Sequence, residues 1–489
     1  MTILMPSDTR AALKEKAEHC ASRSLYFDRF AVPGAKPDEK REWHNALRNK
    51  SAHQEKLGAW TQWLLSWRNG SGNRQRPDIL YAQLQSRLMV NMAGGVMENA
   101  GLCLDRFGMP YIPGSAVKGC ARRAALAALH EWSETGQKPG VSDQDQENVF
   151  KAACEPFATP AEMLAAIAQV FGWGDTDWTN TRKDGRFISD FAYACGDQLW
   201  SVVRAEAQKK LGSPFPKQFA GAVSFLPAYP VDLGKTGKVE GLPCELPPLG
   251  KLELDIVTCH HQIYYSAEPD RQRQPDKWRE WQEHRSAPDT EEPNPVFFPA
   301  VAAGHVFAFA LLPLRNCSRD CLEQARTWLA EGLAAFGLGA KTAAGYGWFN
   351  CAQEVQRAVS SGREEMERKK AEDRRRAEEE TRRQREEQER QRKAAELKAA
   401  TENMTPDEKA DFEIKDWDNN RLFNHFDRFA QLTTEQKAAI YRLLRGRKAD
   451  LWHKLRKAAL EGTVKERKRW GNFVQVMFQM AKQRKEKMP

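Results

Sequence analysis

FGLGAKTAAGYGWF, residues 336–349, is the most informative stretch of this 489-residue chain. Glycine permits tight turns and close approach of two backbones, and exposed peptide N–H groups can bind phosphate oxygens. The stretch lacks the GKS or GKT ending of a P-loop, so alone it is only a weak indication of a phosphate site. Its candidate RNA-binding residues are Gly337, Gly339, Lys341, Thr342, Gly345 and Gly347.

A second segment, GMPYIPGSAVKGCARR at residues 108–123, favours the same chemistry. Pro113 disfavours helix before it, and Ser115 is a good N-cap, so a helix is predicted to begin near residue 115. Lys118 and Arg122 are four residues apart and share a face near that N-terminus, where free N–H groups favour an anion. Read alone, the segment fits an ordinary solvated helix face better than an anion site.

Five segments in this order resemble the RAMP superfamily of CRISPR proteins, and within it the sixth-subunit family of the Cmr (type III-B) effector complexes. They are PYIPGSAVKGCARRA, FLPAYP, KLELDIVTCHHQIYYS, PNPVFF and GLGAKTAAGYG, and the resemblance covers about residues 80–352. It implies that the Gly-rich loop packs beside the first helix. Ser115, Lys118 and Arg122 would then join the loop in one RNA-binding site.

The hydrophobic pattern predicts strands at residues 81–92, 222–226, 252–257, 305–312 and 346–351, with helices after residue 115 and at 320–336. Without insertions the order is β-α-β-β-α-β, so the fold class is α+β with a ferredoxin-like/RRM-type domain. The predicted domain spans residues 79–355, with insertions at about 136–217 and 266–296. Residues 1–78 form an N-terminal helical extension, in which Trp60, Trp63 and Trp67 recur at helical spacing.

The tail differs from the body in charge and pattern. Residues 356–489 contain 35 Lys and Arg against 25 Asp and Glu, whereas residues 1–355 contain 40 against 41. Residues 356–400 are predicted to be a charged helical spacer, because opposite charges recur three or four residues apart without an apolar seam. Residues 401–489 recover helical apolar periodicity and are predicted to be a basic helical module. It either contacts RNA or an acidic partner, or is a solubilising appendage.

Composition excludes several classes of protein. No run of about 18 apolar residues and no signal peptide is present, so we expect a cytoplasmic protein without a membrane partner. The ten cysteines form no CxxC pair. Only two groups of cysteine and histidine come near the spacing of metal ligands. They are Cys259-His260-His261, and Cys317 with Cys321, four residues apart on a predicted helix. We favour buried or incidental thiols there, and expect neither a metal nor a cofactor.

The candidate catalytic residues are Asp105, Asp175, Asp177, Asp255, His260 and His261. No carboxylate cluster or nucleophile-base spacing stands out among them, so turn chemistry and subunit contacts are the simpler interpretation. The resemblance implies a non-catalytic subunit that holds the 3′ part of a CRISPR guide RNA, contacts target RNA, and adjoins other RAMP subunits of the Cmr complex in antiviral defence. The alternative is a metal-independent RAMP endoribonuclease that processes repeat RNA with His260 or His261 as acid or base.

Overall fold

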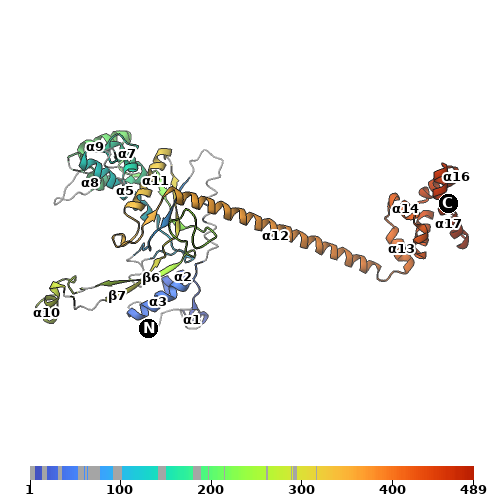
Figure 1. Cartoon of the computed structure of the whole chain (residues 1–489), viewed down its shortest axis with the longest axis horizontal. Helices are drawn as coiled ribbons and strands as arrows, with labels where there is room; N and C mark the ends of the chain where they lie inside the picture. Colours follow the sequence, from blue (N-terminus) through green and yellow to red (C-terminus); the bar gives the residue numbers. More distant parts are fainter. Residues whose placement is uncertain are drawn as a thin grey trace. The chain divides into compact units, whose positions relative to one another are not determined.

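The computed structural model describes residues 6–13, 19–30, 36–52, 60, 63, 77–91, 102–140, 150–179, 189–196, 198–213, 215–259, 261, 263–287, 289, 294–314 and 316–489. The chain divides into two compact units, Met1–Lys369 and Lys370–Pro489, each described by itself below (Figure 1). Among these residues, no helix is long and apolar enough to cross a membrane.

The first unit is built on an antiparallel sheet in the order β4-β8-β1-β9. Its strands are β1 (Asp78–Leu84), β4 (Val223–Phe225), β8 (Val306–Pro313) and β9 (Phe349–Asn350), and β5 (Tyr229–Pro230) also pairs with β8. Helix α5 (Gly114–Thr135) follows β1, and α11 (Arg319–Ala335) follows β8. The succession β1-α5-β4-β8-α11-β9 is that of the split βαβ motif. The predicted α+β class is therefore confirmed.

Helices α5 and α11 pack against each other and cover one face of the sheet. Leu80 and Phe309 lie opposite each other in the β1–β8 register, and both belong to the main core beneath these helices. The helices approach closely because residue 332 is glycine: a Cβ there would lie 2.7 Å from the carbonyl oxygen of Cys120.

The other face of the sheet is covered by the first turns of α12 (Gln353–Thr401). Val355 and Val359 are fully buried and pack in a second core cluster with Tyr81 of β1. The Arg363 guanidinium donates a hydrogen bond to the Tyr81 hydroxyl. The beginning of α12 is thus part of the core of the first unit.

The helix-rich segment between α5 and β4 joins the main core as well. It contains α6 (Lys151–Cys154), α7 (Pro160–Phe171), β2 (Gly172–Trp173), the 3-10 helix η3 (Asp175–Trp178), α8 (Asp190–Cys195), α9 (Trp200–Lys210) and β3 (Phe219–Ala220). Phe171 stacks on Phe225 of β4 and Trp328 of α11, with ring centroids 5.5 and 5.8 Å apart. This insertion therefore contributes a wall to the central domain.

A long hairpin forms a second insertion. Strands β6 (Leu252–Cys259) and β7 (Asn294–Val301) pair along their whole length, and α10 (Pro275–Glu283) lies in their connection, away from the sheet in Figure 1. The helices α1 (Ser7–Ala12), α2 (Arg23–Arg29) and α3 (Pro37–Asn49) precede the sheet. Arg23 holds α2 to the body, because its Nη1 donates to the carbonyls of Gly108 and Gly250 at 3.2 and 2.7 Å.

Element boundaries differ from the predicted ones in three places. Helix α5 begins at Gly114, and Pro113 rather than Ser115 is its N-cap, because the Pro113 carbonyl accepts the N–H groups of Ala116 and Val117. The first strand ends at residue 84 rather than 92, and the last covers only 349–350. Residues 85–89 instead bond irregularly to residues 340–348 and, at Leu88, to Val301 of β7.

The second unit has its own apolar core. Its helices after α12 are α13 (Pro406–Ile414), α14 (Asn419–Phe426), α15 (Thr434–Arg445), α16 (Ala449–Glu461) and α17 (Val464–Gln483). Thr405, Thr433 and Thr463 each close a capping box, which explains why the helices begin there. The exposed part of α12 carries i,i+4 ion pairs such as Lys393 with Glu389 at 2.7 Å, each worth a few tenths of a kcal/mol.

Candidate nucleic-acid interface

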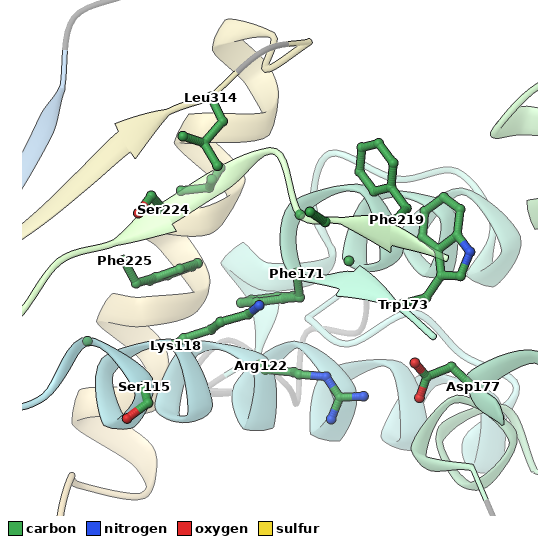
Figure 2. A pocket seen from close by; sticks show the side chains of 15 residues that line it. Ser115, Lys118, Arg122, Phe171, Trp173, Asp177, Phe219, Ser224, Phe225 and Leu314 are labelled. Carbon is green, nitrogen blue, oxygen red and sulfur yellow. The ribbon is translucent and has the colours of Figure 1, made fainter. Parts of the chain in front are cut away.

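A pocket of about 670 Å³ opens beside the N-terminal half of α5. Ser115, Lys118 and Arg122 of α5 line one side, and residues of η3, β2, β3 and β4 line the others. Figure 2 shows Lys118 extending from α5 toward Phe171, with Trp173 and Phe219 on the neighbouring strands. Helix α5 can begin this close to β4 because residue 114 is glycine: a Cβ would lie 2.3 Å from the Phe225 carbonyl oxygen.

The pocket carries a net positive charge among its lining side chains. Partial burial, and then the charge of Arg122, lower the pKa of Lys118. Arg122 forms an ion pair with Asp190 of α8, and Asp177 contributes a carboxylate whose Oδ2 accepts the Gly174 N–H at 2.6 Å. A phosphate near Lys118 would relieve the repulsion between the two cations, and peptide N–H groups of the first helical turn favour the same ligand.

Aromatic side chains form the wall opposite α5, and sequence reasoning missed them. Trp173 stacks on Phe215 and Phe219 with centroid separations of 5.2 and 4.8 Å, which fixes the β2–β3 wall. The signal available in the sequence was FGWGDTDW at residues 171–178, which was assigned only to an insertion. Trp173 is buried, so the partly exposed Phe219 is the ring of this wall that could stack on a nucleobase beside the cations.

The Gly-rich loop is shaped by contacts to the chain that follows β1. The N–H of Ala340 donates to the Met89 carbonyl at 2.7 Å, and the N–H of Gly347 donates to the Arg87 carbonyl at 2.8 Å. Gly339 has φ +103°, and a Cβ there would lie 2.2 Å from the Met89 carbonyl oxygen. Residues 343–345 at the tip of the loop are exposed.

Lys341 lies in a cluster that the sequence pattern did not predict. Its Nζ lies 5.1 Å from the centroid of the Phe298 ring on β7, and its backbone is left-handed at φ 58°. Tyr346, from the same loop, donates to Asp255 of β6 at 2.5 Å, and Arg87 pairs with Asp255 at 2.8 Å. Burial would raise the pKa of Asp255, but these hydrogen bonds and charges outweigh it and lower that pKa.

The Gly-rich loop and the Lys118 pocket adjoin different faces of α5. The start of the loop does pack beside the helix: the Cys120 thiol lies 3.6 Å from the Gly337 carbonyl oxygen, and the Arg123 guanidinium lies 4.1 Å from the Phe336 ring. Among the described residues, however, the lining of the Lys118 pocket includes none from the loop. Lys118 and Arg122 lie on a different face of α5 from Cys120 and Arg123, which is why the loop and the pocket are separate.

Three of the acidic catalytic candidates, Asp105, Asp177 and Asp255, have hydrogen-bond partners. Asp105 accepts the N–H groups of Phe107 and Met109, both at 2.9 Å, as in a turn. Asp175 and Asp177 belong to η3, and Asp255 is paired as described above. His261 has φ 58°, whereas His260 lies outside the described residues.

Within the described ranges, no three His, Cys, Asp or Glu side chains are grouped so that they could hold a metal ion. Cys317 and Cys321 are both buried, and burial raises the pKa of each thiol, that of Cys321 to about 12. The prediction that both lie on one helix was wrong, because α11 begins at Arg319, after Cys317. The cap formed by the Ser318 side chain explains this start.

Comparison with known proteins places these features in a family. Residues 66–350 match the RAMP superfamily. The Cmr subunit Cmr6 of the CRISPR system of Pyrococcus furiosus is 26% identical over 264 residues, which are 54% of this chain and 64% of that relative. The chain therefore spans less than two thirds of the length of this curated relative.

Two solved structures are also similar to the chain. A cryo-EM structure of the type III-B Cmr-beta bound to cognate target RNA shares 15% identity, covers 65% of this chain and 72% of that chain, and has a TM-score of 0.31. The crystal structure of Cmr6 from Pyrococcus furiosus shares 20% identity, covers 57% and 98%, and has a TM-score of 0.25. Similarities at this level carry no argument about geometry. The match over residues 66–350 covers more than half of the chain, and the chain therefore belongs to the RAMP superfamily.

Proposed function

We propose that this chain is a non-catalytic, RNA-binding structural subunit of a type III-B CRISPR (Cmr) effector ribonucleoprotein. In this role it holds the 3′ part of the guide RNA next to other RAMP subunits, and the assembled complex meets target RNA. The observation that carries the proposal is the Lys118–Arg122 pocket on α5, in a chain of the RAMP superfamily that is similar to a Cmr subunit. Membership of the Cmr assembly, the bound RNA and the partner subunits are all parts of what we propose.

The pocket supports RNA binding because it combines three elements of phosphate and base recognition. Lys118 supplies positive charge, beside the guanidinium of Arg122 that pairs with Asp190. The first turn of α5 supplies N–H groups, and the partly exposed Phe219 of the β2–β3 wall supplies an aromatic ring. The body of the chain is nearly neutral, with 40 basic against 41 acidic residues in 1–355, so RNA affinity must come from such local placement. Lys341 adds a cation on the loop side of α5.

The structural roles of the acidic candidates support a non-catalytic subunit. The Asp105 carboxylate stabilises a turn, and the Asp255 carboxylate joins β6 to Arg87 and Tyr346. No described geometry favours the endoribonuclease alternative. Incubation of the purified chain with repeat RNA in EDTA would distinguish the two, because metal-independent cleavage that is lost in His260→Ala would support the alternative.

The proposal predicts that Lys118→Ala, Arg122→Ala and Lys341→Ala, combined in one chain, weaken guide RNA retention in the complex. Each lost phosphate contact on single-stranded RNA should reduce the slope of log affinity against log salt by about 0.7. Arg48→Ala, Lys209→Ala and Lys238→Ala form the matched control, since these exposed side chains lie outside the pocket and carry the same total charge. Thermal unfolding of both triple variants should remain within about 0.5 kcal/mol per substitution of the parent.

Filter binding across a salt series, together with co-purification of RNA and partner proteins, measures both effects. Equal retention and equal salt slopes in the two triple variants would contradict the site. Failure of the unaltered chain to co-purify with any RAMP partner or RNA would contradict the proposed function itself.

A further inference from the structure

The C-terminal unit carries cations that its own acids do not neutralise. Residues 428–489 contain 17 Lys and Arg against 5 Asp and Glu. The acids of the preceding segment neutralise two of the arginines: Asp411 pairs with Arg442 at 2.8 Å, and Asp427 pairs with Arg469 at 2.5 Å. Glu486 pairs with Arg445 at 2.7 Å. Of the 14 cations that are left, seven lie on α16 and α17.

Four of these cations, together with Phe478, lie on the exposed side of the packed pair α16 and α17, which we call the α16–α17 face. Helical spacing places Arg456 and Lys457 on the outer side of α16, and Arg467 and Lys482 on a stripe of α17 with Phe478. The Arg456 guanidinium lies 5.6 Å from the centroid of the Phe478 ring, so the two helices present these side chains together. All five side chains are exposed, and no ion pair involves the four cations among the described residues.

Phe478 adds an exposed aromatic ring to the cations of this face. Its side chain is 41% exposed, although the core of the unit lies directly beneath it. Its ring meets that of buried Trp452 edge to face, with centroids 5.5 Å apart, so its orientation is fixed. A held aromatic ring surrounded by cations can stack on a nucleobase while the cations contact phosphates.

The apolar residues of both helices argue against a membrane surface. Leu451, Trp452 and Leu455 of α16 are buried in the core of the unit, as are Trp470 and Phe473 of α17. An interfacial helix needs a wide apolar face for the lipid, whereas Leu460 and Val464 are the only large apolar side chains besides Phe478 that the described part of these helices exposes. Cations with one exposed ring fit an extended polyanion that carries bases.

We infer that the α16–α17 face is a second, sequence-tolerant binding site for single-stranded RNA. Arg456, Lys457, Arg467 and Lys482 contact phosphates, and Phe478 stacks on a base. The site lies wholly within residues 449–483 of the C-terminal unit, so it does not depend on the guide RNA function proposed for the body.

The test uses the full-length chain carrying Lys118→Ala, Arg122→Ala and Lys341→Ala, so that the body site contributes as little as possible. The probe is a labelled, unstructured single-stranded RNA oligonucleotide, measured by fluorescence anisotropy over a salt series. The face variant changes Arg456, Lys457, Arg467 and Lys482 to Gln. The matched control changes Lys409, Lys415, Arg428 and Arg447 to Gln, with the same loss of charge at exposed positions of the same unit.

The face variant should lose about tenfold or more in affinity, and its salt slope should fall by about 2 to 3, whereas the control should keep most of both. Phe478→Ala should lose about tenfold with an unchanged slope, and Phe478→Tyr should restore binding. Ultraviolet cross-links should map to α16 and α17. Equal losses in the two quadruple variants, cross-links confined to residues 1–369, or binding of phosphatidylserine vesicles in place of RNA would overturn the inference.

Discussion

Two glycines of the same loop differ in what a side chain would meet. Gly339 and Gly345 have φ +103° and +91°, so both occupy backbone conformations that L residues rarely adopt. At position 339 a Cβ would also lie 2.2 Å from the Met89 carbonyl oxygen, whereas at 345 nothing lies within 4 Å. A side chain therefore meets conformational strain alone at position 345, and strain together with a clash at position 339.

Gly339→Ala is expected to destabilise the chain by about 2–4 kcal/mol, because strain and displacement of the 89–90 backbone add together. Gly345→Ala should cost only about 1 kcal/mol, since only backbone strain remains. Thermal unfolding of the two variants beside the parent measures the difference. Gly345→Asn serves as the control, because Asn tolerates the left-handed region. Equal losses of stability in the alanine variants at positions 339 and 345 would contradict this geometry.

At the scale of elements, Glu331 couples helix α11 to α6. Its Oε1 accepts the Ala153 N–H at 2.8 Å, while its buried Oε2 has no hydrogen-bond partner among the described residues. Burial raises the pKa of Glu331 to about 7, above the ordinary value of 4.5. Between these two values the folded state binds more protons than the unfolded state, so this residue lowers stability as pH rises from about 4.5 to 7.

Glu331→Gln should therefore stabilise the chain at pH 8 by about 1–2 kcal/mol, because glutamine keeps the acceptor and removes the buried charge. Near pH 5 the variant and the parent should be almost equally stable, since the parent carboxyl is then protonated when folded. Denaturation at the two pH values tests this. A stability difference that does not change with pH would contradict the raised pKa.

At the scale of the whole molecule, helix α12 belongs to both compact units. Its beginning is part of the body, because Val355 and Val359 are fully buried and Gln356 accepts the Tyr81 N–H at 3.0 Å. From residue 370 onward it belongs to the second unit. The position of a C-terminal truncation therefore determines whether α12 still covers the second core cluster at Tyr81 of β1.

Truncation after Lys369 should leave a folded body whose thermal unfolding is close to that of the parent. Truncation after Val355 removes Val359 and Arg363, exposes the second core cluster, and should cost several kcal/mol or cause aggregation. Residues 401–489 alone should give a helical circular dichroism spectrum, because their core lies entirely within that range. A disordered isolated module, or equal stability of the two truncated bodies, would contradict this organisation.

The sequence by itself determined the α+β class, the helices after residues 114 and 319, and the helical tail. These features depend on spacing over a few residues: Ser, Thr and Pro mark helix starts, and apolar periods of 2 and 3.6 separate strands from helices. The order of short sequence segments also indicated the family. Two of these segments contain Gly114 and Gly339, where the fold requires glycine because a Cβ would clash with another part of the backbone.

Only the tertiary structure decided which of these residues meet. Lys118 faces Trp173 and Phe219 because the insertion folds back onto β4, and no local pattern specifies that return. The hairpin β6–β7 places Phe298 beside Lys341, whereas the described lining of the Lys118 pocket contains no residue of the Gly-rich loop. Contacts between distant segments depend on how whole elements pack, and helical or strand spacing encodes only which face of each element is apolar.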